Sequence, residues 1–152
     1  MAAGYRVYFS GDCSGVKGRK GQQGLGLAVK EEIVKKSCKD GIAIECISAR
    51  LLKARISIKP TFDTFVVAYA PTEDVTEGEK AKYMAAFNST VKPVPAREHV
   101  FVLTDANNRT RNRGEGGGEI DSKVLGAYDQ GVLNKNGKLL HSVSQKTTNL
   151  LF

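Results

Sequence analysis

A chain of 152 residues, 41% of them hydrophobic, has the length of one domain with a buried core, and its formal charge of +7 favours polyanionic partners such as nucleic acid. Three cysteines without a CxxC spacing and only two histidines argue against a disulfide framework and against a Cys/His zinc site. No apolar run has the length of a signal peptide or a membrane span, so we expect one intracellular, non-secreted domain over residues 1–152 with no membrane partner.

The first half of the chain predicts a series of strands. Apolar, aromatic and β-branched runs occur at residues 5–9, 24–30, 42–47, 52–58 and 62–68. In the fourth run Leu52, Ala54 and Ile56 alternate with polar residues, which is the period of a strand with one buried face. Pro71 ends the fifth run, because proline lacks the amide proton and forces extended geometry on the residue before it.

A helix is predicted next, over residues 76–91. Thr76 and Glu79 have the spacing of a capping box, and apolar side chains follow at helical spacing up to Val91. Two prolines end this helix before the strand 100–103, whose continuous apolar run predicts burial on both faces.

The C-terminal third predicts little regular structure. Residues 105–138 are dense in Asn, Gly and Arg, which is typical of loops. Leu139, Leu140 and Val143 could form one face of a short helix, and a further strand is expected to begin at Leu150. Strands interleaved with a helix in this order predict a layered α/β (α+β) fold without a repeat.

Polar side chains mark the ends of two of the predicted strands. One ends in Tyr69-Ala70-Pro71, and another runs into Asp105 and Asn107. The spacing of two residues predicts that the side chains of Asp105 and Asn107 leave the strand on the same side. In α/β sheets the carboxyl ends of strands are where sites gather, so these three polar residues would converge if the two strands were neighbours. A carboxylate can activate water, an amide can donate to a phosphate oxygen, and a phenol can donate to a leaving group. The alternative is structural, since Asp at a strand end often only bonds its own turn and Tyr-Ala-Pro can be a rigid strand exit.

Two basic segments could form a rim that attracts phosphate groups. Their residues are Arg109, Arg111 and Arg113 in one segment and Lys17, Arg19 and Lys20 in the other. A solvated loop in each place is the alternative reading.

The order of segments resembles the endonuclease/exonuclease/phosphatase superfamily. The segments are GLGLAV, SARLLKARISI, FVVAYAPTED, a helix, VFVLTDANNRT and LNKNGKLL. Their order is most similar to the apurinic-type endonuclease domains of non-LTR retrotransposons and of craniofacial development protein-like relatives, over about residues 5–152. The resemblance implies a sandwich of two β-sheets with helices outside, and a magnesium-dependent phosphodiesterase acting on nucleic acid, with DNA favoured over RNA.

The resemblance also implies roles for single residues. Tyr69 would lie in the active site, Asp105 would align or activate the attacking water, and Asn107 would contact the scissile phosphate. The Gln-Glu strand end that holds magnesium in this superfamily and its Ser-Asp-His ending have no counterpart here, so the chain is expected to be a partial domain. The alternative function is therefore a catalytically inactive module that binds nucleic acid or protein. An incomplete sandwich would also expose a sheet face through which the chain could self-associate.

Overall fold

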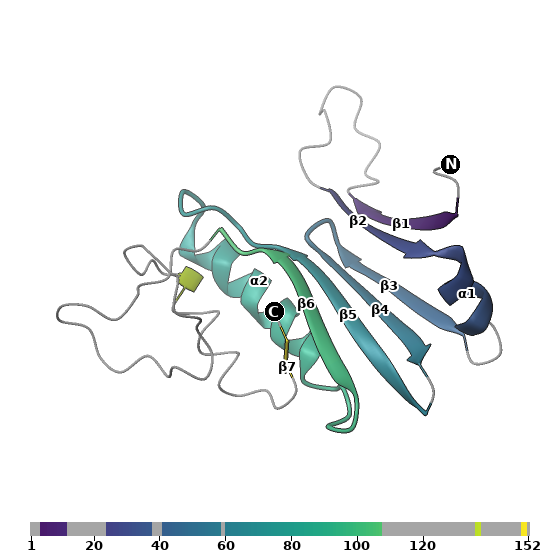
Figure 1. The fold of residues 1–152 in the computed structure, drawn as a ribbon. Coiled ribbons are helices and arrows are strands. Elements are labelled where there is room, and N and C mark those ends of the chain that lie inside the picture. The colour runs from purple at the N-terminus through teal and green to yellow at the C-terminus, as the bar shows by residue number, and fades with distance from the viewer. Residues whose placement is uncertain are drawn as a thin grey trace, which may run out of the picture.

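The computed structural model describes residues 4–11, 24–37, 41–58, 60–107, 136–137 and 150–151 (Figure 1). Its elements are β1 (Tyr5–Gly11), β2 (Gly24–Lys30), α1 (Glu31–Ser37), β3 (Ile42–Ser48), β4 (Leu51–Ile58), β5 (Thr61–Tyr69), α2 (Glu77–Val91), β6 (His99–Asp105) and β7 (Leu150–Leu151). The strands form two sheets, one of β1 and β2 and one in the order β3-β4-β5-β6-β7. The predicted α+β class with two layered sheets is confirmed.

The five-stranded sheet is mixed, and its strand pairing changes from antiparallel to parallel at β5. β3, β4 and β5 pair antiparallel, whereas β5 and β6 are parallel neighbours joined by the crossover through α2. A parallel pair needs such a crossover, because its two strands begin at the same edge of the sheet. The carboxyl ends of β5 and β6 therefore lie together, which is the condition for Tyr69 and Asp105 to converge.

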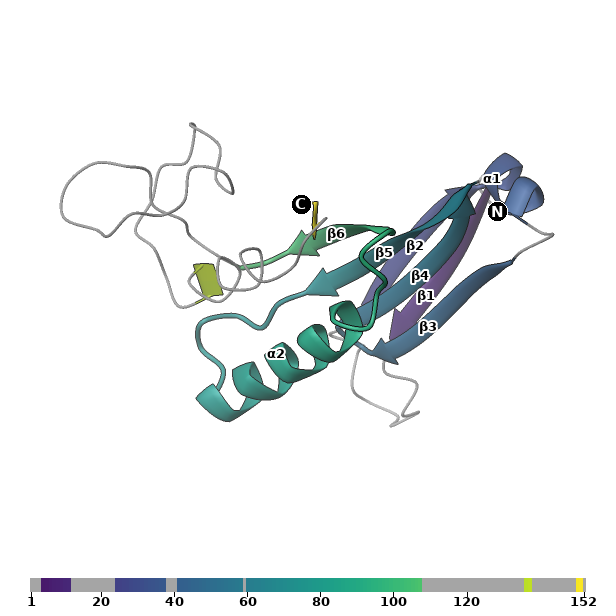
Figure 2. The ribbon, with the colours of Figure 1, turned by 90° about the horizontal axis from the view of Figure 1, so that it is seen from below.

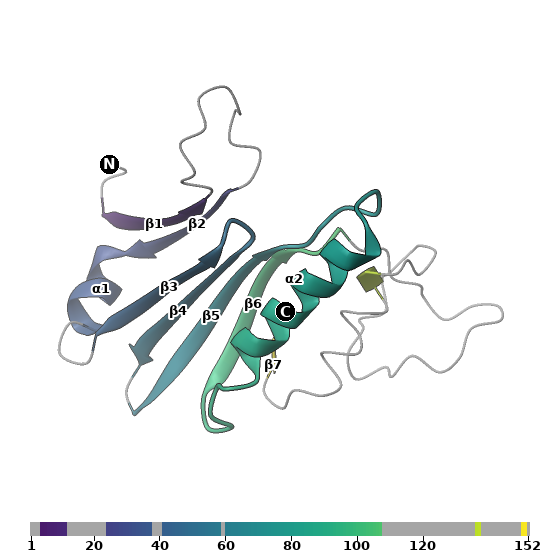
Figure 3. The same ribbon diagram turned by 180° about the vertical axis from the view of Figure 1, so that it is seen from behind.

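Helix α2 covers one face of this sheet. It begins with the predicted capping box, in which the Thr76 hydroxyl accepts from the Glu79 amide and the Glu79 carboxylate accepts from the Thr76 amide. Phe87 and Val91 pack against Val66 and Val102 of the sheet. Figure 2 shows α2 running along the sheet, and in Figure 3 it lies in front of β6.

The β1–β2 hairpin and α1 cover the other face of the large sheet. Leu27, Val29 and Val34 form a second core cluster with Leu52 and Ala54 of β4. The hairpin lies on the β3 side of the molecule, and α2 lies on the β6 side (Figure 1). Among the described residues the cover on this face is partial, since the hairpin packs mainly against β3, β4 and β5.

Two expectations from the sequence need correction. Helix α1 was not predicted, although Glu31 in its first turn and Lys36 in its last turn complement the helix dipole. The prediction that both faces of the strand 100–103 are buried is wrong, because Val102 is buried while Leu103 is 47% exposed. An apolar run predicts a strand, but its sequence does not show whether a second layer covers the strand's other face.

Of the remaining predictions, some fall on described residues and others lie outside them. The strand beginning at Leu150 is confirmed as the short β7, which pairs parallel with β6. The helix expected at 139–143 and the loops expected over most of 105–138 lie outside the described residues. None of the described helices is long and apolar enough to span a membrane.

Candidate functional site

The register of the parallel pair brings Tyr69 and Asp105 side by side. They are direct Cα partners, and each is the last residue of its strand. The direction of the Tyr69 side chain follows from Val67, two residues earlier on the same strand, which packs toward the β1–β2 hairpin and away from α2. On β6, Phe101 stacks on Phe65 with ring centroids 5.1 Å apart, so the odd-numbered residues of both strands share this face. We call Tyr69, Asp105 and Asn107 together the strand-end site.

Asn107 reaches the site by a different route from the one expected. The spacing of two residues suggested that Asp105 and Asn107 leave the same strand in the same direction, but β6 ends at Asp105 and Asn107 has φ 44° in the left-handed region. Its amide Nδ2 donates to the carbonyl oxygen of Ala70 at 2.8 Å. Asn107 therefore ties the exit of β6 to the exit of β5.

Asp105 also has a local structural role. One of its carboxylate oxygens accepts the backbone amide of Asn107 at 3.1 Å, which is the turn-forming bond considered as the alternative from sequence. Its backbone oxygen accepts the Ala70 amide at 2.9 Å. The side chain is nevertheless exposed, and its second carboxylate oxygen has no hydrogen-bond partner among the described residues.

Arg50 lies beside the strand-end site and was not among the predicted site residues. It occupies the turn between β3 and β4, and its guanidinium lies 5.1 Å from the centroid of the Tyr69 ring. One guanidinium nitrogen, Nη1, makes long contacts of 3.4 Å and 3.5 Å to the carbonyl oxygens of Tyr69 and Ala70. In the antiparallel pair of β4 and β5, Leu51 lies opposite Ala68, which places Arg50 opposite Tyr69. The register of these two predicted strands could therefore have revealed that Arg50 neighbours Tyr69.

Asn136 is a second residue that the sequence did not single out. Its side-chain nitrogen donates to the carbonyl oxygen of Pro71 at 2.8 Å, and longer bonds reach Ala106 and Asn107. It is buried, so these bonds satisfy a polar group that has left water. No signal in the segment LNKNGKLL distinguishes this asparagine from Asn134.

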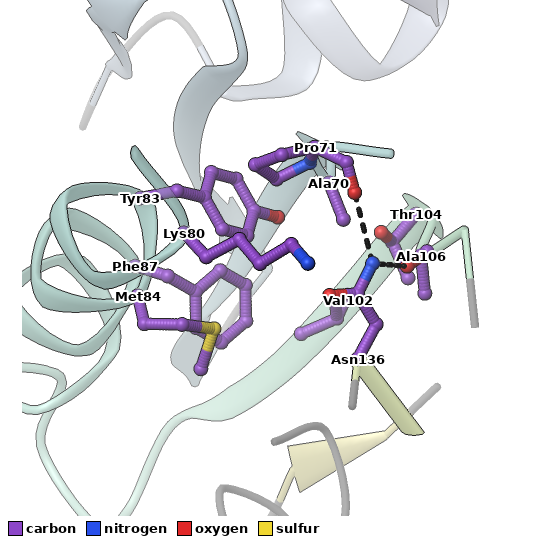
Figure 4. Close-up of a pocket in the computed structure, with 10 residues that line it drawn as sticks. All are labelled: Ala70, Pro71, Lys80, Tyr83, Met84, Phe87, Val102, Thr104, Ala106 and Asn136. Carbon is purple, nitrogen blue, oxygen red and sulfur yellow. Dashed lines mark hydrogen bonds between the residues drawn. The ribbon is translucent and has the colours of Figure 1, made fainter. Parts of the chain in front are cut away.

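A pocket lies between α2 and β6 (Figure 4). It is on the α2 face of the sheet, which is opposite to the face of Tyr69 and Asp105. Tyr83, Met84 and Phe87 line one side of it, and Val102 and Thr104 of β6 line the other. Its volume of about 30 Å³ suits water molecules rather than an organic substrate. Burial raises the pKa of the Tyr83 hydroxyl to about 12, and the charge of Arg50 opposes this rise. The Tyr83 hydroxyl is therefore neutral near pH 7. The pocket adjoins the strand-end site, because Ala70, Pro71 and Ala106 of the two strand exits also line it.

The six predicted rim cations, Lys17, Arg19, Lys20, Arg109, Arg111 and Arg113, all lie outside the described residues. The ends of the segments that carry them are described. Ser10, near the end of β1, donates its hydroxyl to the carbonyl oxygen of Ser48 at 2.7 Å, beside the turn that holds Arg50. The first basic segment therefore starts at the same end of the molecule as the strand-end site.

The described residues of the strand-end site are too few to hold the magnesium ion that the superfamily resemblance implies. Mg²⁺ requires near-octahedral oxygen ligands, and proteins usually supply at least two carboxylates or one with substrate phosphates. Within the part of the chain that the structure describes, no group of three or more Asp, Glu, His or Cys side chains could hold a metal. Asp105 alone makes no magnesium site.

Comparison of the chain with protein-family models, with curated proteins and with solved structures finds no match in any of the three. The superfamily resemblance therefore remains a prediction from the sequence motifs.

Proposed function

We propose that this chain binds the phosphodiester backbone of nucleic acid at the strand-end site and that it derives from the endonuclease/exonuclease/phosphatase superfamily. The observation that carries the proposal is the alignment of Tyr69 and Asp105 at the carboxyl ends of adjacent parallel strands. The phenol of Tyr69 is a donor suited to phosphate oxygens, and α2 does not cover the face on which Tyr69 lies.

The net charge supports the same proposal. A formal charge of +7 attracts polyanions and makes the affinity depend strongly on salt. Asp105 is the exception at the site, because its carboxylate repels a phosphate when no cation bridges the two. Binding without cleavage fits a site in which the described residues supply one exposed carboxylate and no metal cluster.

Phosphodiester hydrolysis with magnesium is the second candidate. The observation that favours it is the second carboxylate oxygen of Asp105, which has no partner among the described residues and lies on the same side of the sheet as Tyr69. A bound metal would supply charge neutralisation at the scissile phosphate. Its remaining ligands would have to come from outside the described residues.

The variant Asp105→Asn separates the two candidates. It keeps the oxygen that accepts the Asn107 amide but removes the negative charge. For a binding domain, we expect affinity for a fluorescent DNA oligonucleotide in EDTA to rise about fivefold, from the loss of about 1 kcal/mol of like-charge repulsion. For a hydrolase, magnesium-dependent nicking of supercoiled DNA should disappear in this variant.

The control for both measurements is Asp74→Asn, which removes the same charge in the exposed loop before α2. No binding of DNA or RNA by the wild-type chain at low salt, together with no nicking, would contradict both candidates. Parallel titrations with single-stranded DNA, duplex DNA and RNA test the expected preference for DNA.

A further inference from the structure

We propose that Arg50 is the phosphate-binding cation of the strand-end site, an inference that rests on the proposed function and assigns its main electrostatic contact. Neither the motif Tyr-Ala-Pro nor the motif Asp-Ala-Asn includes this residue. Its position follows from the turn that brings β3 back into β4, directly opposite the end of β5.

The backbone of Arg50 is fixed on both sides. Its amide donates to the hydroxyl of Ser48 at 3.1 Å, and its carbonyl oxygen accepts the amide of Tyr69 at 3.0 Å. Ser48 in turn accepts the Ser10 hydroxyl through its carbonyl oxygen, which fastens the turn to β1. The stem of the side chain therefore starts from a position that the sheet determines, and the loss of side-chain freedom on binding is reduced.

The guanidinium is also held in place, by contacts that leave most of its donors unused. It lies over the Tyr69 ring, and only Nη1 contacts the two carbonyl oxygens of the strand exit. Contacts of 3.4 Å and 3.5 Å are at the long limit for hydrogen bonds. The remaining N–H groups can form the paired, parallel hydrogen bonds that a guanidinium makes with a phosphate.

Among the described residues Arg50 has no carboxylate partner, unlike the two arginines that lie within strands, Arg6 and Arg55. Arg55 pairs with Glu98, Lys53 with Glu45, and Arg6 with Glu31. No carboxylate of the described residues lies within ion-pair distance of Arg50. A half-buried arginine without a counter-ion raises the local potential, and an anion that binds there is drawn to the face of Tyr69 and Asp105.

A purely structural role would be to hold the strand exit through the contacts to Tyr69 and Ala70. Asparagine side chains already do this at shorter distance, since Asn107 bonds Ala70 at 2.8 Å and Asn136 bonds Pro71 at 2.8 Å. The structural contribution of Arg50 through these carbonyl contacts is therefore small, and no carboxylate of the described residues neutralises its charge.

The test is the salt dependence of oligonucleotide binding in EDTA, measured by fluorescence anisotropy. Arg50→Gln is expected to weaken binding about tenfold and to reduce the slope of log affinity against log salt by about one. Arg50→Lys should keep the slope and lose about threefold in affinity, because an ammonium keeps the charge but not the paired donors. The control Lys82→Gln removes one charge from the exposed face of α2 and should change affinity less than twofold.

Equal effects of Arg50→Gln and Lys82→Gln would overturn the inference and leave the proposed function standing. A second measurement covers the case in which the wild-type chain binds no nucleic acid or Arg50→Gln does not fold. The Arg50 Nε–H signal of the wild-type chain is followed by NMR during titration with dimethyl phosphate. A saturating shift of this signal supports the assignment of Arg50, and an unchanged signal overturns it.

Discussion

The two faces of the β5–β6 pair are built from alternate residues of the same strands, yet one is closed and the other is open. On the α2 face, Val66, Val100 and Val102 are at most 3% exposed. On the opposite face, Leu103 is 47% exposed and Asp105 is exposed as well. The closed face provides the stability that holds the strand ends in register, and the open face presents polar groups to solvent, where the proposed ligand would bind. Side-chain alternation therefore allows one pair of strands to serve both purposes.

The largest contrast between the faces is expected from large-to-small substitutions. Phe87→Ala removes the main contact of α2 with the sheet and should lower the free energy of unfolding by about 3–5 kcal/mol. Leu103→Ala on the open face should cost less than about 1 kcal/mol, because that side chain is half in water already. Urea denaturation followed by circular dichroism measures both. Similar losses for the two variants would show that another part of the protein covers the open face.

The closed face also contains a charged pair, at the end of the sheet away from the site. The Arg55 guanidinium makes two hydrogen bonds with the carboxylate of Glu98, one of them 2.9 Å long, and stacks over the ring of Phe62. The side chain of Glu98 is 1% exposed and that of Arg55 is 36% exposed. Glu98→Gln is expected to cost about 1–3 kcal/mol, below the range for fully buried pairs because water screens one partner.

The same pair makes stability depend on pH. Hydrogen bonds from Arg55, opposed by burial, lower the pKa of Glu98 below its ordinary 4.5. A carboxyl group with a lowered pKa stabilises the folded state above the unfolded-state pKa, and this contribution is lost as pH falls through the folded-state value. Urea midpoints measured from pH 6 down to pH 3 should fall more steeply for the wild type than for Glu98→Gln. The exposed edge pair gives the control: Glu45→Gln should leave the profile and the stability within about 0.5 kcal/mol of wild type.

Substitutions of Asn107 test how much the turn after β6 contributes to stability. Asn107→Ala removes the bond to Ala70 and places a side chain that disfavours φ 44° in that conformation, for an expected loss of about 2 kcal/mol. Asn107→Gly loses the same bond without the conformational penalty, so it should be about 1 kcal/mol more stable than the alanine variant. Thermal unfolding measures the order of the three proteins. Equal stability of the glycine and alanine variants would contradict the left-handed conformation.

The smallest change in stability is expected from a polar substitution on the open face, which also tests self-association. Leu103→Lys should change the unfolding free energy by less than about 0.5 kcal/mol. If the open sheet face mediates self-association, this variant should lower the fraction of dimer in sedimentation velocity experiments. Ile58→Lys, at the exposed end of β4, is the matched control. A wild-type chain that sediments as a monomer at every concentration would remove self-association from the proposal.

The sequence predicted most of the described strands because their apolar runs are bounded by strong signals. Pro71 and the Thr76 capping box mark the change from strand to helix, and both are in place in the structure. Helix α1 was missed because seven residues are too few to show helical periodicity, and its formation depends on packing Val34 against the second core cluster. The exposure of Leu103 was missed because the second layer ends before it reaches β6, which is a property of tertiary structure.

The candidate site was only partly predictable. The rule that sites gather at carboxyl ends of strands singled out Tyr69 and Asp105 on the condition that their strands were neighbours, and the parallel pairing of β5 and β6 meets that condition. The left-handed conformation of Asn107 was not foreseen, because strand alternation was extended beyond the last residue of the strand. Arg50 was missed because it belongs to a turn that is distant in sequence from both motifs, and only the antiparallel register brings it to Tyr69.

The irregularity at the end of β3 has a consequence for the protein in crowded solution. β3 is the outer strand of the large sheet, and its register with β4 shifts between Cys46 and Ser48. A bulge twists an outer strand and interrupts its row of amide and carbonyl groups, and the Glu45 side chain adds a charge beside it. Another chain would therefore find a poor template for edge-to-edge pairing at β3. The fold thus limits uncontrolled aggregation through the β3 edge of the large sheet.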